Sequence, residues 1–204
     1  YARWYDILEK LPEILGISRV RKTLFRKASG EVLEVAAGTG NNLRHYPKDC
    51  KLTLIDLSRE MLNIAAQKAR KQRLEVSIQE MDAESLDFPA NAFDTVVDSL
   101  SLCTLTQPVQ ALREMARVCK PNGRILLLEH GRSSNERLGR WQDKRAERHA
   151  KRFGCNWNRN ILEIVEAANL EMVSSKPYCF GVFHAIEVKP TSIIDTILRQ
   201  QPVD

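Results

Sequence analysis

The chain has 204 residues, a length that suits one domain with at most a small appendage. Hydrophobic residues make up 43% of it and charged residues 28%, a balance that excludes wholesale disorder. No apolar run approaches the roughly 18 residues that span a bilayer, so no transmembrane helix is expected within this sequence. The chain begins with Tyr1 rather than Met, which leaves open a signal, transit peptide or membrane anchor upstream.

The net charge of +5 is unevenly distributed along the chain. Residues 1–30 hold seven Lys and Arg against three Asp and Glu, and residues 131–152 hold eight against three. Such segments suit an anionic partner (lipid headgroups, nucleic acid or an acidic protein face), and a solvated helical face is the alternative. The cysteines form no CxxC and the histidines no HxxxH, so spacing predicts neither a metal site nor a disulfide framework and favours a reducing compartment.

Apolar periodicity and turn residues predict strands that alternate with helices over the first 130 residues. Two short helices are expected within residues 1–28. The expected elements that follow are strands at 31–37, 51–57, 75–81, 93–102 and 124–129, a helix behind Ser58, and a helix at 107–119. Lys120-Pro121-Asn122-Gly123 is a stop and turn signal between that last helix and the fifth strand.

The C-terminal third is predicted to add antiparallel strands to the sheet, unlike the parallel strands before it. The expected elements there are a long basic helix at about 135–153, a helix at 157–168, strands at 171–178 and 182–188 that pair antiparallel, and a short amphipathic helix around 193–198. The predicted fold class is α/β, a doubly wound, Rossmann-like, mostly parallel seven-stranded sheet with an antiparallel strand near the C-terminus. A helical extension (1–29), a main domain (30–190) and a helical tail (191–204) are the expected divisions.

Three features at the expected carboxyl edge of this sheet suggest a nucleoside-bearing ligand. A glycine turn, Gly38-Thr39-Gly40, follows the first strand, but Leu43 stands where a dinucleotide fingerprint needs its third glycine. Asp56 ends the second strand, where an acid can bind both ribose hydroxyls, although capping the next helix is the alternative. Asp82 follows the third strand and could accept the adenine amino group. Two acids around a glycine turn therefore predict a nucleoside cofactor without a pyrophosphate.

Four segments carry a resemblance to a known family: EVLEVAAGTGNN, LIDLSREML, MDAESLDFPANAFDTVV and ALREMARVCKPNGRILLLEH. In order and spacing they resemble the motifs of class I S-adenosylmethionine-dependent methyltransferases, over roughly residues 30–190. Within that superfamily the chain looks most similar to the ubiquinone/menaquinone methyltransferase-like group. It also resembles bacterial phospholipid N-methyltransferases, animal thiol methyltransferase-like proteins and a methyltransferase-like protein of the fungal mitochondrial inner membrane.

The resemblance implies S-adenosylmethionine as cofactor and assigns its binding residues one by one. Those residues are Glu34, Gly38 and Gly40 around the methionine end, Asp56 on the ribose, Met61 near the adenosine, Asp82 and Ala83 around the adenine, and Ser99 beneath the sulfonium. One departure stands out, because the family often has glycine where this chain has Ala36. The added methyl group narrows the approach to the cofactor.

The family's reaction is in-line displacement of a methyl group from a sulfonium, so the protein mainly aligns the reactants. A protonated acceptor also needs a general base, and His130 at the end of the fifth strand is the candidate, with a structural histidine as the alternative. Cys103 is interpreted as a small buried hydrophobe because no Pro precedes it. The segment from Asp98 to Ser101 lacks the Pro-Pro-aromatic pattern of enzymes that methylate amino groups of nucleic acid and glutamine.

The leading hypothesis is a methyltransferase that acts on a small or lipid-like acceptor near a membrane. Residues 135–153 would lie on an anionic surface with Trp141 and Phe153 inserted, although a lid over the active site or plain packing on the sheet fits the same pattern. The alternatives are a methyltransferase-fold assembly subunit of a larger mitochondrial complex and, ranked last, an RNA methyltransferase. The expected location is the mitochondrion, at the matrix or inner-membrane surface, with the cytoplasm as the alternative.

Overall fold

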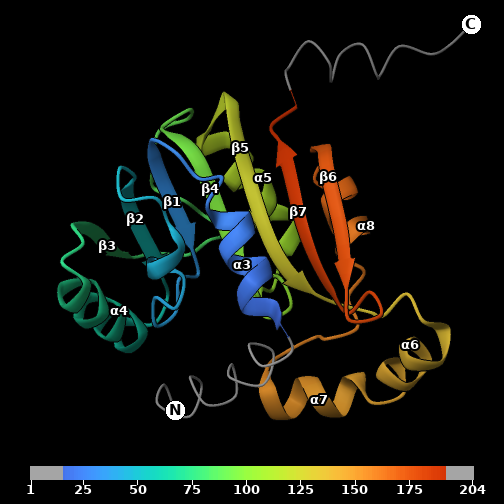
Figure 1. Ribbon diagram of the computed structural model, residues 1–204. Helices are drawn as coiled ribbons and strands as arrows, with labels where there is room; N and C mark the ends of the chain where they lie inside the picture. The colour runs from blue at the N-terminus through green and yellow to red at the C-terminus, as the bar shows by residue number, and fades with distance from the viewer. Residues whose placement is uncertain (1–15, 192–204) are drawn as a thin grey trace, which may run out of the picture.

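A computed structural model of the protein describes residues 16–191. Seven strands form one sheet in the order β3-β2-β1-β4-β5-β7-β6 (Figure 1). The strands are β1 (Glu31–Val35), β2 (Lys51–Asp56), β3 (Val76–Glu80), β4 (Phe93–Ser99), β5 (Cys119–His130), β6 (Glu171–Tyr178) and β7 (Phe183–Lys189). Strands β1 to β5 pair in parallel, whereas β7 runs antiparallel to both β5 and β6. The predicted fold class is therefore confirmed.

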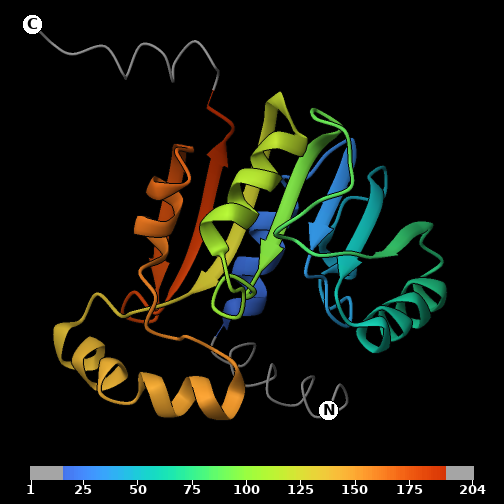
Figure 2. The ribbon, with the colours of Figure 1, turned by 180° about the vertical axis from the view of Figure 1, so that it is seen from behind.

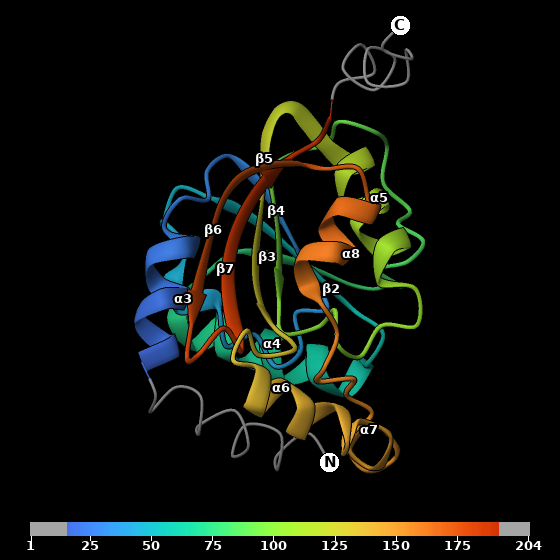
Figure 3. The same ribbon diagram turned by 90° about the vertical axis from the view of Figure 1, so that its right-hand side faces the viewer.

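Helices cover both faces of the sheet. Helices α3 (Ser18–Phe25) and α4 (Arg59–Gln72) contribute to one apolar core, and α5 (Pro108–Val118) and α8 (Ile161–Ala167) contribute to the other. Figure 2 shows α5 and α8 in front of the sheet, and Figure 3 shows α3 on the opposite face. A short 3-10 helix, η2 (Leu43–His45), connects β1 to β2.

The middle of β5 explains how both cores form on one sheet. Successive strand residues point to opposite faces. Ile125 and Leu127 accordingly lie in the core under α5 and α8, whereas Leu126 and Leu128 lie in the core under α3 and α4. All four side chains are fully buried, which is why this strand is continuously apolar rather than alternating.

Two predicted boundaries around β4 and β5 were wrong. The turn expected at 120–123 lies inside β5, which begins at Cys119, and the pairing with β4 shifts register between Phe93 and Thr95. The segment is therefore an irregularity in a strand rather than a separate turn. Strand β4 ends at Ser99 rather than residue 102, because Leu100 adopts a left-handed conformation (φ 61°) that turns the chain.

The long basic helix predicted at 135–153 is in fact two helices, α6 (Glu136–Asp143) and α7 (Ala146–Phe153). The carbonyl of Gln142 accepts the N–H of Arg145, only three residues on, and the indole Nε1 of Trp157 at 3.2 Å. These bonds end the first helix. The helix expected from residue 157 begins at Ile161, where the Asn160 side chain caps it.

Some expectations fall outside residues 16–191. The first of the two N-terminal helices and the amphipathic helix around 193–198 lie there. Within the described part of the chain, no helix combines the length and apolar character needed to cross a membrane.

Replacement of Leu126 by Ala should lower the free energy of unfolding by about 2–5 kcal/mol, because it leaves a cavity in a fully packed layer. Leu57→Ala is the matched control, because that side chain is 64% exposed and its loss should change stability by no more than about 0.5 kcal/mol. Urea denaturation measures both values. Equal losses in the two variants would contradict the assignment of Leu126 to the core.

Candidate functional site

The turn after β1 places backbone, rather than side chains, at the carboxyl edge of the sheet. Ala36, Gly38 and Gly40 all have positive φ angles, of 46°, 56° and 72°. A Cβ built on Gly38 would meet no heavy atom of residues 16–191 within 4 Å, so this part of the backbone is open to a ligand. A Cβ on Gly40 would approach Ala65 of α4 to 3.0 Å. Gly40 therefore lets α4 pack closely, while Gly38 is the glycine that leaves space beside the turn.

Asp56, the last residue of β2, holds this turn in place. Its Oδ2 accepts the backbone N–H of Gly38 at 2.8 Å, and its Oδ1 accepts the N–H of Ser58, the N-cap of α4, at 2.8 Å. The backbone N–H of Ala37 also donates to the carbonyl of Ile55 at 2.9 Å. The carboxylate thus fixes both the turn and the start of α4, and each oxygen keeps a lone pair for a ligand.

Two adjoining cavities lie along this edge and share Ala36, Asp56 and Thr104. The first, of about 210 Å³, is lined by residues of α3, the β1 turn, α4 and the loop after β4, including Arg21, Glu34, Gly38, Met61 and Ser99. The second, of about 290 Å³, is lined on its far side by Met81, Asp82, Ala83 and Glu84. Asp56 therefore stands between two halves of one elongated site.

The second cavity is bounded by the segment after β3. The backbone N–H of Met81 donates to the carbonyl of Asp56 at 3.1 Å, which holds the ends of β2 and β3 together. Asp82 is half-buried, and its Oδ1 accepts the N–H of Glu84 at 2.9 Å. The carboxylates of Asp56 and Asp82 accordingly border one hollow, as the two-acid prediction requires.

A buried polar network closes the other end of the site. The Glu34 carboxylate accepts Nδ2 of Asn42 at 2.6 Å and the hydroxyl of Tyr46 at 2.8 Å, and Asn42 in turn accepts a hydrogen bond from Arg21. Burial raises the pKa of Glu34 from 4.5 to about 7, against the opposing effect of these hydrogen bonds. Nε of Arg21 is buried and has no hydrogen-bond partner among residues 16–191. It is a donor available to an anionic group at this end of the first cavity.

The loop after β4 forms the floor of the first cavity. Ser99 lines the cavity, and its buried hydroxyl has no partner within the described residues. Beneath the loop, Ser101 donates its hydroxyl to Asp98 and its backbone N–H to Glu129. Burial raises the pKa of Asp98 to about 6 and that of Glu129 well above its usual range. One proton shared by these neighbouring carboxyl groups satisfies the two oxygens that otherwise lack donors.

The structure brings most of the predicted site residues together. The cavity linings include Glu34, Gly38, Asp56, Met61, Asp82, Ala83 and Ser99. Gly40 lies behind them against α4. His130, the candidate base, lines neither cavity, and its Nε2 faces Sγ of Cys155 at 3.5 Å.

Arg21 is the main cavity residue that sequence reasoning missed. It lies on α3, before the first strand, and is only 2% exposed. A signal was available, because Arg21 interrupts the apolar spacing of Ile17, Leu24 and Phe25 on one helix face. An arginine in the buried stripe of a helix needs a polar neighbour, which the Asn42 side chain supplies.

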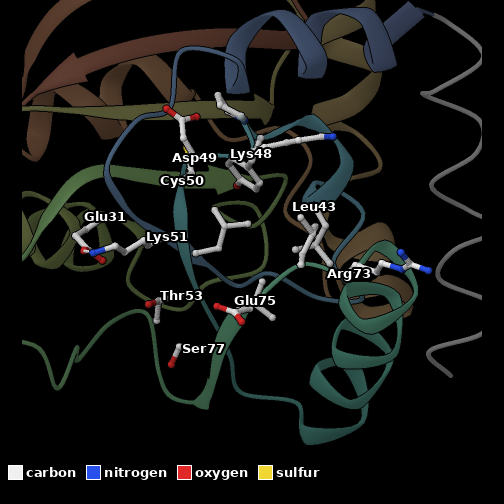
Figure 4. A pocket seen from close by; sticks show the side chains of 15 residues that line it. Glu31, Leu43, Lys48, Asp49, Cys50, Lys51, Thr53, Arg73, Glu75 and Ser77 are labelled. Atoms are coloured by element: carbon white, nitrogen blue, oxygen red, sulfur yellow. Dashed lines mark hydrogen bonds and ion pairs between the residues drawn. The ribbon is translucent and has the colours of Figure 1, made fainter.

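A larger cavity, of about 720 Å³, lies elsewhere. Figure 4 shows Glu31, Lys51, Glu75 and Ser77 around it, and these residues lie at or near the starts of β1, β2 and β3. Parallel α/β sheets bind ligands beyond the carboxyl ends of their strands. This cavity is at the opposite ends, and its Glu31–Lys51 ion pair, at 2.8 Å, is solvent-exposed. Cavity volume is therefore a poor guide to the ligand-binding site in this sheet.

The residues present fit S-adenosylmethionine. Two carboxylates border one half of the site, while an open glycine backbone, an orphaned Ser99 hydroxyl and an orphaned Arg21 Nε border the other. Asp56 and Asp82 would hold the adenosine, and Arg21 can pair with the methionine carboxylate. The fold and this site together define a Rossmann-like enzyme domain that binds a nucleoside cofactor.

Comparisons with known proteins assign the family. A methyltransferase-domain model matches residues 33–127. A phosphatidylethanolamine N-methyltransferase of Cereibacter sphaeroides is 34% identical, over 74% of this chain and 75% of that protein. The mitochondrial methyltransferase OMS1 of Saccharomyces cerevisiae is 31% identical over 92% of this chain, which spans 44% of the yeast protein's length. The chain therefore belongs to the class I S-adenosylmethionine-dependent methyltransferases, and S-adenosylmethionine is its cofactor.

The solved structures agree on the fold. A geranyl diphosphate C-methyltransferase of Streptomyces coelicolor A3(2), whose structure contains S-adenosyl-L-homocysteine, superposes with a TM-score of 0.69. The match covers 85% of this chain and 80% of that one, with 14% sequence identity.

Asp56→Ala should weaken binding of S-adenosylhomocysteine by roughly 10- to 150-fold, because hydrogen bonds to a charged group contribute about 1.5–3 kcal/mol. Isothermal titration calorimetry measures the change. Asp49→Ala is the control, since Asp49 is exposed beside the large cavity at the other end of the strands and its removal should leave binding unchanged. Unaltered affinity in the Asp56 variant would exclude its role on the ribose.

Glu34 should make stability depend on pH. Its pKa is raised in the folded chain, so folding favours the protonated form and this contribution is lost as the pH rises from about 4.5 to about 7. The unfolding free energy of the wild type should therefore fall relative to that of Glu34→Gln by roughly 3 kcal/mol across this range. Urea denaturation as a function of pH measures the difference, and parallel curves for the two proteins would contradict the prediction.

Proposed function

We propose that this chain transfers a methyl group from S-adenosylmethionine to a small or lipid-like acceptor at an anionic membrane surface. The single observation that carries the membrane part is the surface of α6 and α7. Cationic side chains surround an exposed tryptophan there, and a shallow hollow among them is lined by Arg137, Arg140, Trp141, Lys144 and Arg145. The Arg145 guanidinium lies 4.8 Å from the centre of the Trp141 ring. Cations around an aromatic side chain suit the interface of a lipid bilayer.

The position of these helices supports the same proposal. Figure 1 shows α6 and α7 beyond the arrowhead of β5, at the end of the sheet where β1 and β4 also finish. Phe153 on α7 and Phe180 in the β6–β7 turn are 53% and 74% exposed. Ser133, just before α6, donates its hydroxyl to the carbonyl of Phe180 at 2.5 Å, which keeps that turn beside α6. A membrane on this side would face the carboxyl edge that holds the cofactor cavities.

The relatives favour a lipid acceptor and a mitochondrial location. One relative is a phosphatidylethanolamine N-methyltransferase and another is a mitochondrial methyltransferase. These similarities support a mitochondrial membrane surface as the proposed location. A methyltransferase-fold assembly subunit remains the second candidate, and Ala36 is the observation that favours it, because a methyl group with φ 46° borders both cavities.

The proposed mechanism relies on alignment. When bound, S-adenosylmethionine supplies an electrophilic methyl group on a positively charged sulfur. Asp56 and Asp82 orient the adenosine, and Ser99 offers its free hydroxyl to the cofactor from the floor of the first cavity. Asp98 and Glu129, which share one proton, keep one negative charge beneath that end, which favours binding of a cation. Holding the reactants in line can supply roughly 7–11 kcal/mol of the barrier.

Arg140→Gln/Lys144→Gln should reduce binding to vesicles that contain an anionic phospholipid by roughly 30-fold, because each surface cation contributes about 1 kcal/mol. Vesicle flotation measures the effect, and binding of the parent protein should weaken with added salt. The control is Arg70→Gln/Lys71→Gln, which removes two exposed cations from α4 and should leave vesicle binding unchanged.

Transfer of labelled methyl groups into lipid extracts tests the acceptor. Equal binding of the parent to neutral and anionic vesicles would refute the proposed surface.

A further inference from the structure

Three potential metal ligands that lie far apart in the sequence meet beside the cofactor site. Cys103 comes from the loop after β4, His130 from the end of β5, and Cys155 from the segment between α7 and α8. One ligand atom from each lies within 4.8 Å of the other two. Sγ of Cys155 and Nε2 of His130 are 3.5 Å apart. No other Cys, His, Asp or Glu ligand atom of residues 16–191 joins this group.

Hydrogen bonds between separate segments hold the backbone around the cluster in place. The carbonyl of Cys103 accepts the backbone N–H of Asn156 at 2.8 Å and its Nδ2 at 3.2 Å. The carbonyl of Cys155 lies 2.9 Å from Nδ1 of His149, whose ring stacks on Trp157 at 4.0 Å. Arg159 bridges the same segments, because its guanidinium donates to the carbonyls of Leu102 and Leu105. The two cysteines are thus held together by contacts that do not involve their sulfur atoms.

The separation of Cys155 Sγ and His130 Nε2 matches a tetrahedral zinc site. Zinc binds cysteine sulfur at about 2.3 Å and histidine nitrogen at about 2.0–2.1 Å, which places the two ligand atoms of a tetrahedral site about 3.5 Å apart. Two sulfurs and an imidazole are also the soft and borderline ligands that zinc prefers over magnesium or calcium. His130 and Cys155 are half-buried and Cys103 is 2% exposed, so the cluster is largely shielded from solvent but not closed off.

We propose that Cys103, His130 and Cys155 bind one zinc ion and leave its fourth position to water. Three protein ligands with an open position are the pattern of reactive rather than purely structural zinc sites. The ion would lie next to the methyl-transfer site, because Ser101 and Thr104, on either side of Cys103, both line the first cofactor cavity. In this assignment His130 is a metal ligand instead of a general base. The zinc site is independent of which acceptor the enzyme methylates.

The test is the zinc content and cobalt spectrum of the whole chain, purified without a metal-binding tag. Plasma mass spectrometry should find about one zinc per chain, and cobalt(II) in place of zinc should give a sulfur-to-cobalt charge-transfer band. Cys155→Ser and His130→Asn should each lower zinc affinity tenfold or more. Cys179→Ser is the matched control, since Cys179 is also half-buried but lies outside the cluster, and it should keep one zinc.

Calorimetry with S-adenosylhomocysteine establishes that each variant is folded and separates this proposal from the proposed function. Zinc loss with retained cofactor binding in the Cys155 and His130 variants supports the site. A reduced parent chain that binds no zinc and shows no charge-transfer band overturns it, whatever the variants do. A His130 variant that loses turnover but keeps its zinc overturns the ligand role in favour of the general base. A Cys103–Cys155 disulfide, seen as the loss of two hydrogens in the mass of the unreduced chain, also overturns it.

Discussion

The carboxylate of Asp56 is the interaction on which the rest of the site depends. One oxygen holds the N–H of Gly38 in the turn after β1, and the other holds the N–H of Ser58 at the start of α4. Without an acceptor at this point, two backbone donors at a partly buried strand end would lose their protein partners and the turn could relax away from β2. The Asp56 carboxylate therefore stabilises the wall of the cavity and also faces a ligand bound in it. Structure and ligand binding are therefore inseparable at this residue.

The sequence allowed the sheet and most of the cofactor site to be predicted, because local signals specify both. Continuous apolar runs such as Ile125 to Leu128 predict buried parallel strands, and strands of that kind place their carboxyl ends along one edge. Asp56 and Asp82 could be placed together on this ground alone. The predictions that were wrong concern the boundaries of strands and helices, and distant contacts determine the helix boundaries. The indole of Trp157, fifteen residues away, takes part in ending α6, and no periodicity within residues 135–153 contains that information.

The same distinction applies to the side chains that meet from separate segments. Cys103, His130 and Cys155 have no motif spacing, since each pair is separated by more than twenty residues. Their proximity follows from the β4–β5 pairing and from the hydrogen bonds of Asn156 and Arg159 to the loop after β4. Local sequence rules identify a zinc site when its ligands are close in sequence, and they miss one assembled by the tertiary fold.

The packing of α3 has a practical consequence for where the catalytic unit starts. Residue 30 looks like a natural boundary, since the first strand and the family pattern both begin just after it. Yet Leu24 and Phe25 are buried in the core on that face of the sheet, and Arg21 forms part of the wall around the first cavity. A shortened chain that starts at β1 would uncover Leu126 and Leu128 and open the first cavity to water. Helix α3 thus covers the binding site, and its removal would abolish function together with stability.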